Sequence, residues 1–129
     1  MKEIIETGNI PIRIVSSANI VEHWAKKYKR ESQQRMIIQN WITPLLSQIT
    51  LPVKMTLIRI APRALDDDNL AYGLKSHRDC ICDLIRPGMA PGRADGDSLV
   101  KVKYMQNKGK PKEYALKIIF EPLNKDEND

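Results

Sequence analysis

The fold is decided by the stretch from Val53 to Ile85, which reads VKMTLIRIAPRALDDDNLAYGLKSHRDCICDLI. Its first residues alternate between apolar and polar, and through Ile58 and Ile60 apolar residues occupy both faces, as expected of an interior β-strand. From about Asn69 the apolar residues recur at helical spacing until Pro87 stops the pattern. The stretch therefore predicts a strand followed by a helix.

The residues before this stretch predict a strand and a helix. Isoleucines at 10, 12 and 14 alternate with other residues, which indicates a short strand, and Pro11 places it at a sheet edge or a strand start. A helix is predicted from about Val21 to Trp41, and Thr43 with Pro44 predicts a further short turn. The apolar and aromatic residues expected to contact the core from this helix are Trp24, Tyr28, Met36, Ile37 and Trp41.

Two more strands follow the second helix. Apolar residues alternate with lysines from Leu99 and again from Tyr114 to Phe120, and the segment from Asn107 to Pro111 predicts a hairpin tip between them. The order β-α-β-α-β-β predicts an α+β (α/β) fold in which two helices pack on one four-stranded mixed sheet. We expect one domain over residues 1–123 and a polar tail over residues 124–129.

Composition narrows the class of protein. With 129 residues, 42% hydrophobic and 29% charged, multidomain and disordered chains are disfavoured. The 21 Lys and Arg outnumber the 16 Asp and Glu by five, which favours an anionic partner, with nucleic acid first. No stretch predicts a signal peptide or a membrane span, so we expect a cytoplasmic protein. Cys80 and Cys82 are predicted to be buried thiols.

Three carboxylates, Asp66 to Asp68, stand together at the junction between the predicted strand and helix. Adjacent carboxylates repel one another, so such a cluster costs stability unless something compensates for its charge. The helix N-terminus is one compensator, since its free amides and its dipole favour aspartate. A divalent cation is the other. Both interpretations are open at this point.

The helical wheel of the second helix separates a core face from a polar face. Lys75 and Asp79 fall on the same side as Asp68, which is typical of a solvated surface and is also compatible with a site. His77 falls on the apolar side, where a hydrogen-bonded core histidine is expected more often than a ligand. The residues of the predicted core face are Leu70, Leu74, His77, Ile81, Leu84 and Ile85.

A second acidic pair, Asp95 and Asp97, precedes the third strand. If that strand pairs beside the strand that ends near Ala61, a carboxylate from its start could meet Asp66 and Asp68 at one edge of the sheet. Three hard oxygen ligands suit Mg²⁺, which can generate a hydroxide nucleophile and offset charge on a phosphodiester. The alternative for this pair is an ordinary turn around Gly96.

Two basic stretches could bind phosphates. Residues 26–35 hold five basic side chains and one acid, with Tyr28 among them and Trp24 just before them. Residues 101–112 hold five lysines and no acid. Either stretch could equally be a solvated face. Basic surface around an acidic metal pocket is the combination that a nuclease requires.

The segments DDDNLAYGLKSHRDCICDLI and GRADGDSLVKV resemble the RusA-type Holliday junction resolvases, a family common in phages and prophages. The likeness carries the signature Asp-x-Asp-Asn, a helix with a lysine and a downstream aspartate, and an acidic turn that leads into a strand. It implies a homodimer in the cytoplasm of a bacterial host, encoded by the host or by a prophage. The homodimer binds four-way DNA junctions and cuts them symmetrically with Mg²⁺ or Mn²⁺ in recombination and repair.

The resemblance assigns roles residue by residue. It implies that Asp66, Asp68 and Asp97 bind the metal and act in catalysis, with Asn69 and Asp95 supporting them. The family's lysine falls on Tyr72 here, so Lys75, one helical turn later, is its candidate replacement, and Asp79 keeps the spacing of four from that lysine. The residues expected to hold the DNA backbone are Asn19, His23, Lys26, Lys27, Lys29 and Arg30.

The sequence therefore predicts a Mg²⁺-dependent, structure-selective DNA endonuclease that resolves Holliday junctions. One rival is a non-catalytic module of the same fold that binds branched DNA. The other is a protein-interaction or regulatory domain, in which the acids are helix caps and the lysines a solubilising surface.

Overall fold

A computed structural model describes residues 3–15, 24–87 and 99–123 of the chain. Its helices and strands follow in the order β-α-β-α-β-β, with one short 3₁₀ helix after the first α-helix. The elements are β1 (Ile5–Ile10), α1 (Trp24–Ile42), η2 (Thr43–Gln48), β2 (Val53–Ala61), α2 (Asp67–Ile85), β3 (Val100–Lys108) and β4 (Ala115–Pro122). The predicted α+β fold with a four-stranded mixed sheet and two helices is confirmed.

The sheet has the strand order β1-β4-β2-β3. β2 runs parallel to β3 and antiparallel to β4, and β1 runs antiparallel to β4. β2 is therefore an interior strand, as its apolar pattern predicts, and most of its residues are buried. Parallel neighbours require a crossover, which α2 provides between β2 and β3.

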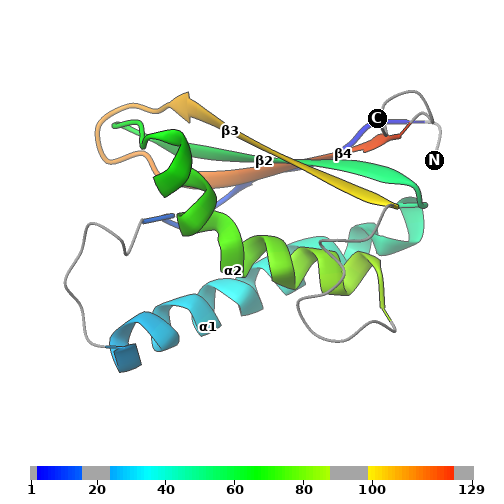
Figure 1. Ribbon diagram of the computed structural model, residues 1–129, viewed down its shortest axis with the longest axis horizontal. Helices are drawn as coiled ribbons and strands as arrows, with labels where there is room; N and C mark the ends of the chain where they lie inside the picture. The colour runs from blue at the N-terminus through cyan, green and yellow to red at the C-terminus, as the bar shows by residue number, and fades with distance from the viewer. Residues whose placement is uncertain (1–2, 16–23, 88–98, 124–129) are drawn as a thin grey trace.

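Both helices lie on one side of the sheet (Figure 1), and the core fills the space between the helices and the sheet. Side chains from both layers lose all or nearly all of their contact with water there, and this burial is the main source of stability. The completely buried members of the core are Ile10, Ile38, Ile42, Val53, Met55, Leu57, Leu74, Ile81, Cys82, Leu116, Ile118 and Phe120. Within the described residues, no helix has the length and apolar character that a membrane crossing requires.

The first strand lies earlier in the chain than predicted. β1 ends at Ile10, and residues 11–15 form no strand, although Ile12 and Ile14 are buried as their alternation suggests. Side chains, in place of a neighbouring strand, give hydrogen bonds to the backbone here. The Gln34 side-chain amide donates to the Arg13 carbonyl (2.8 Å), and Arg59 donates to the Ile14 carbonyl (3.1 Å).

Helix α1 buries a different face from the predicted one. Trp24, Tyr28 and Met36 are 74%, 65% and 65% exposed, and Trp41 is 38% exposed, so these four are not core residues. The buried positions are Gln34, Ile38 and Ile42, which recur every four residues, and Ile37 packs beside them as predicted. The aromatic residues mislead because α1 has apolar side chains on more than one face, and only packing against the sheet selects the buried one.

The predicted hairpin between the last two strands is wrong. β3 and β4 lie on opposite sides of β2, so the connection after Lys108 crosses the end of β2. The Gly109 amide donates to the carbonyl of Ala61 at that end (2.9 Å). β2 takes the interior place because it is apolar on both faces, whereas β3 carries exposed lysines on one face, as edge strands commonly do.

Candidate functional site

The acidic turn, Asp66–Asp68, links β2 to α2 and caps the helix. Oδ1 of Asp66 accepts a hydrogen bond from the Asn69 amide (2.9 Å), and Asp67 and Asp68 lie in the first turn. The capping interpretation is therefore confirmed for Asp66. All three carboxylates are exposed to solvent.

The loop before the acidic turn is held by side chains from two strands. Gln106 of β3 forms two hydrogen bonds with Leu65: its Oε1 accepts from the Leu65 amide (3.0 Å), and its Nε2 donates to the Leu65 carbonyl (2.6 Å). Arg59 of β2 donates to the carbonyl of Arg63 (2.8 Å). These contacts, which we call the loop clamp, fix the backbone immediately before Asp66.

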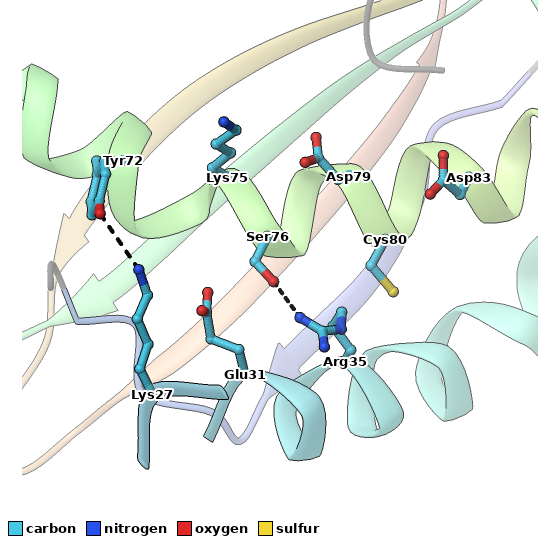
Figure 2. Close-up of a pocket in the computed structure, with 9 residues that line it drawn as sticks. All are labelled: Lys27, Glu31, Arg35, Tyr72, Lys75, Ser76, Asp79, Cys80 and Asp83. Atoms are coloured by element: carbon cyan, nitrogen blue, oxygen red, sulfur yellow. Dashed lines mark hydrogen bonds between the residues drawn. The ribbon is translucent and has the colours of Figure 1, made fainter. Parts of the chain in front are cut away.

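The polar face of α2 and the first half of α1 border a groove of about 530 Å³ (Figure 2), the interhelical groove. Lys75 and Asp79 both line it and project from the same side of α2, as the helical wheel predicts. Lys27 reaches across from α1, with Nζ 3.5 Å from the Tyr72 hydroxyl and 5.2 Å from the centre of its ring. Arg35 donates to the Ser76 hydroxyl (2.8 Å).

The groove carries both signs of charge. Its lining includes three cations, Lys27, Arg35 and Lys75, and three acids, Glu31, Asp79 and Asp83. Asp79 also accepts hydrogen bonds from Arg78 (3.1 and 3.2 Å). Cations that approach from both helices could bind phosphates along the groove, while the acids limit how strongly they do so.

The predicted DNA-binding residues divide into separate groups. Lys26 and Lys29 are exposed on α1, Lys27 lines the interhelical groove, and Arg30 is partly buried. Asn19 and His23 lie outside the described residues. Of the predicted basic patch, the structure thus brings Lys27 into the same groove as Lys75.

Asp95 and Asp97 also lie outside the described residues. The strand that follows them, β3, begins at Val100, which pairs with Val53 at the start of β2, whereas the acidic turn follows the end of β2. Figure 1 shows this separation, with α2 beginning at the end of the sheet where the β3 arrow points. The strand after Asp97 does pair beside β2, as predicted, but the expected approach of its start to the acidic turn is wrong.

Two of the expected metal ligands, Asp66 and Asp68, are described. Their carboxylate oxygens are of the type that Mg²⁺ prefers, and capping engages one oxygen of Asp66. In the described ranges, no three side chains of His, Cys, Asp or Glu are grouped so that they could hold a metal ion. Because β3 starts at the opposite end of β2, the predicted third ligand, Asp97, does not belong to the same site, and water or phosphate oxygens would have to complete the coordination of an ion there.

Two buried titratable groups of α2, His77 and Cys80, are poor acid–base catalysts. Burial, together with the nearby charge of Arg35, lowers the pKa of His77 to about 4, so the imidazole is neutral at pH 7. Its Nε2 lies 2.7 Å from Oε1 of Gln34, as expected of a hydrogen-bonded core histidine. Burial raises the pKa of the Cys80 thiol, which disfavours a nucleophilic thiolate. Both cysteines are buried thiols that form no disulfide, as predicted.

The sequence analysis does not predict three polar residues that are important for the structure: Gln34, Arg59 and Gln106. A signal exists for two of them. Arg59 interrupts an otherwise apolar interior strand, and Gln106 continues the inward-facing alternation of Val102 and Tyr104. Gln106 bonds to the backbone of Leu65, 41 residues away, and Arg59 bonds to the carbonyl of Ile14, 45 residues away. Local sequence patterns do not reveal partners at such separations.

In comparisons with known proteins, no family model, no curated protein and no solved structure matches this chain.

Proposed function

We propose that this protein is a Mg²⁺-dependent, structure-selective DNA endonuclease that resolves four-way junctions. The observation that carries the proposal is the acidic turn itself: exposed carboxylates follow an interior strand and lie on a backbone that the loop clamp holds. Preorganised ligands of this kind reduce the reorganisation that metal binding requires. The excess of five positive charges favours an anionic substrate.

Asp66 and Asp68 would hold the ion, and water and phosphate oxygens would complete its coordination, as Mg²⁺ commonly accepts. When bound, Mg²⁺ supplies a hydroxide nucleophile and offsets the negative charge of the transition state. Asp68 and Lys75 are seven residues apart on one face of α2, or about 10 Å along its axis. Helical side chains tilt toward the N-terminus, so Lys75 leans toward Asp68 and can approach a phosphate bound near the acidic turn.

A homodimer fits the proposed substrate. A four-way junction has two strands to be cut symmetrically, and a domain of this size has room for one such site. The cations of the interhelical groove, Lys27, Arg35 and Lys75, would bind the arms of the junction through their phosphates.

Junction cleavage tests the proposal. We expect the wild-type protein to make paired, symmetric nicks in a synthetic four-way junction with Mg²⁺, and Asp68→Asn to lower the rate at least 100-fold while junction binding in gel shifts persists. Asp67→Asn is the matched control, because it removes the same charge from the middle of the acidic turn, outside the Asp-x-Asp-Asn pair. Equal cleavage by wild type and Asp68→Asn would exclude this mechanism.

A non-catalytic module that binds branched DNA is the second candidate. It is favoured by Tyr72, which occupies the position where the resembling family has its lysine and which instead contacts Lys27. This candidate predicts junction binding without nicking, unaffected by Asp68→Asn or Asp97→Asn. Failure to bind linear or branched DNA at any salt concentration would favour the protein-interaction domain instead.

A further inference from the structure

A second cavity, of about 220 Å³, lies at the ends of β2 and β3 and in the loop that follows β2. Its lining includes three cationic side chains, Arg59, Arg63 and Lys108, and the two amides of Gln106 and Asn107. None of the described residues that line it is a carboxylate. Unlike the interhelical groove, this cavity therefore presents positive charge alone.

Arg59 is the most unusual of these residues, because only 7% of it is exposed. Buried charges are normally paired with opposite charges. In the described part of the chain, Arg59 donates only to the carbonyls of Ile14 and Arg63, which are neutral groups. Burial, and then the neighbouring charge of Arg13, lower its pKa. Those bonds use Nε and Nη1, so Nη2 keeps its donors for another acceptor.

The position of the cavity suits a ligand of the proposed nuclease. Arg59 pairs with Gln106, and Ala61 pairs with Lys108, so the cavity lies at the carboxyl ends of two parallel strands. Open sheets with parallel strands commonly bind ligands at that end. Ala64 lines the cavity and stands two residues before Asp66, so a ligand there lies next to the acidic turn.

We propose that this cavity, the arginine pocket, binds a phosphate group of the DNA backbone. Nη2 of Arg59 would donate to a phosphate oxygen, and the positive charges of Arg63 and Lys108 would attract the phosphate from the solvent side. The presence of an anion-binding pocket stands on the cavity alone. Its assignment to DNA rests on the proposed function, because a phosphate held here would place a neighbouring phosphodiester at the acidic turn.

Phosphate binding tests the pocket without any nuclease assay. We expect inorganic phosphate to shift the Nε–H resonance of Arg59 in NMR spectra, and the double variant Arg63→Gln/Lys108→Gln to weaken that binding at least tenfold. Both side chains can be changed without touching the loop clamp, since Arg63 contributes to it only its carbonyl. The matched control is Lys110→Gln/Lys112→Gln, which removes two exposed charges nearby, outside the pocket, and should change binding less than twofold.

A short DNA duplex tests the source of the phosphate. In fluorescence anisotropy we expect the pocket variant to weaken duplex binding more than the control variant, and to reduce the slope of log K against log salt by about two. Equal loss in both variants, with a mononucleotide bound more tightly than DNA, would overturn the assignment to DNA.

The outcomes separate the two proposals. If inorganic phosphate leaves the Arg59 resonance unchanged, the arginine pocket is wrong whether or not junctions are cut. If phosphate binds as expected but wild type never nicks a junction, the proposed nuclease is wrong and the anion pocket stands.

Discussion

At the scale of single residues, Asp66 illustrates how one side chain can serve two roles. Its Oδ1 caps α2, which satisfies an amide at the helix start, and its carboxylate carries the charge that a metal ion would need. Asparagine caps helices about as well as aspartate does, but it lacks the charge. The two roles can therefore be separated by substitution.

We predict that Asp66→Asn leaves the free energy of unfolding within a few tenths of a kcal/mol of wild type, whereas Asp66→Ala lowers it by about 1 kcal/mol. Urea denaturation measures both values. If the proposed nuclease is correct, both variants lose junction cleavage, since neither retains the carboxylate. A large loss of stability in Asp66→Asn would show that its charge, and not the cap, stabilises α2.

His77 makes stability depend on pH. Its pKa is about 4 in the folded protein and about 6.5 when unfolded, so between these values the unfolded chain binds the proton more tightly. The stabilisation is therefore complete above pH 6.5 and is lost as pH falls toward 4. The difference between the two pKa values corresponds to about 3 kcal/mol in the free energy of unfolding.

We predict that, when the pH is lowered from 7 to 4, the free energy of unfolding falls by about 3 kcal/mol more for wild type than for His77→Gln. Urea denaturation across that pH range measures both values. The glutamine can still hydrogen-bond with Gln34, and His23, the other histidine, is present in both proteins. Parallel stability curves for the two proteins would contradict the assigned pKa.

At the scale of elements, the loop clamp connects the sheet to the acidic turn. Gln106 belongs to β3 and Leu65 to the loop after β2, so their two hydrogen bonds join segments 41 residues apart. A net contribution of about 1 kcal/mol is typical of each such bond. The clamp and the helix cap therefore hold consecutive parts of the backbone where the loop enters α2.

We predict that Gln106→Leu lowers the free energy of unfolding by about 2 kcal/mol and speeds hydrogen exchange of the Leu65 amide, because both bonds are lost. Gln33→Leu, the same change at an exposed position of α1, should be close to neutral. Unchanged exchange at Leu65 would mean that the clamp does not hold the loop.

At the scale of the whole molecule, topology decides which side chains meet. The interhelical groove joins Lys27 to Tyr72, and the arginine pocket joins β2 to β3 at the end opposite Val100. The crossover through α2 makes β2 and β3 parallel, which brings their carboxyl ends together. The same arrangement separates the start of β3 from the acidic turn.

The sequence alone determined the element order, the interior position of β2 and the core face of α2, which includes Leu74, His77 and Ile81. These features are local, because apolar residues at a period of two or 3.6 define a buried face within one element. The cap at Asp66 is local for the same reason, since its partner is three residues away.

The other features arise only when the elements pack: the exposure of Trp24 and Tyr28, the separation of β3 from β4, and the contacts of Arg59 and Gln106. Each of these depends on a choice between neighbours far along the chain. A helix with several apolar faces buries whichever one meets the sheet, and a strand pairs with the partner that best covers it. Periodicity within one element carries no information about that choice, so the groove and the pocket emerge only when the elements pack.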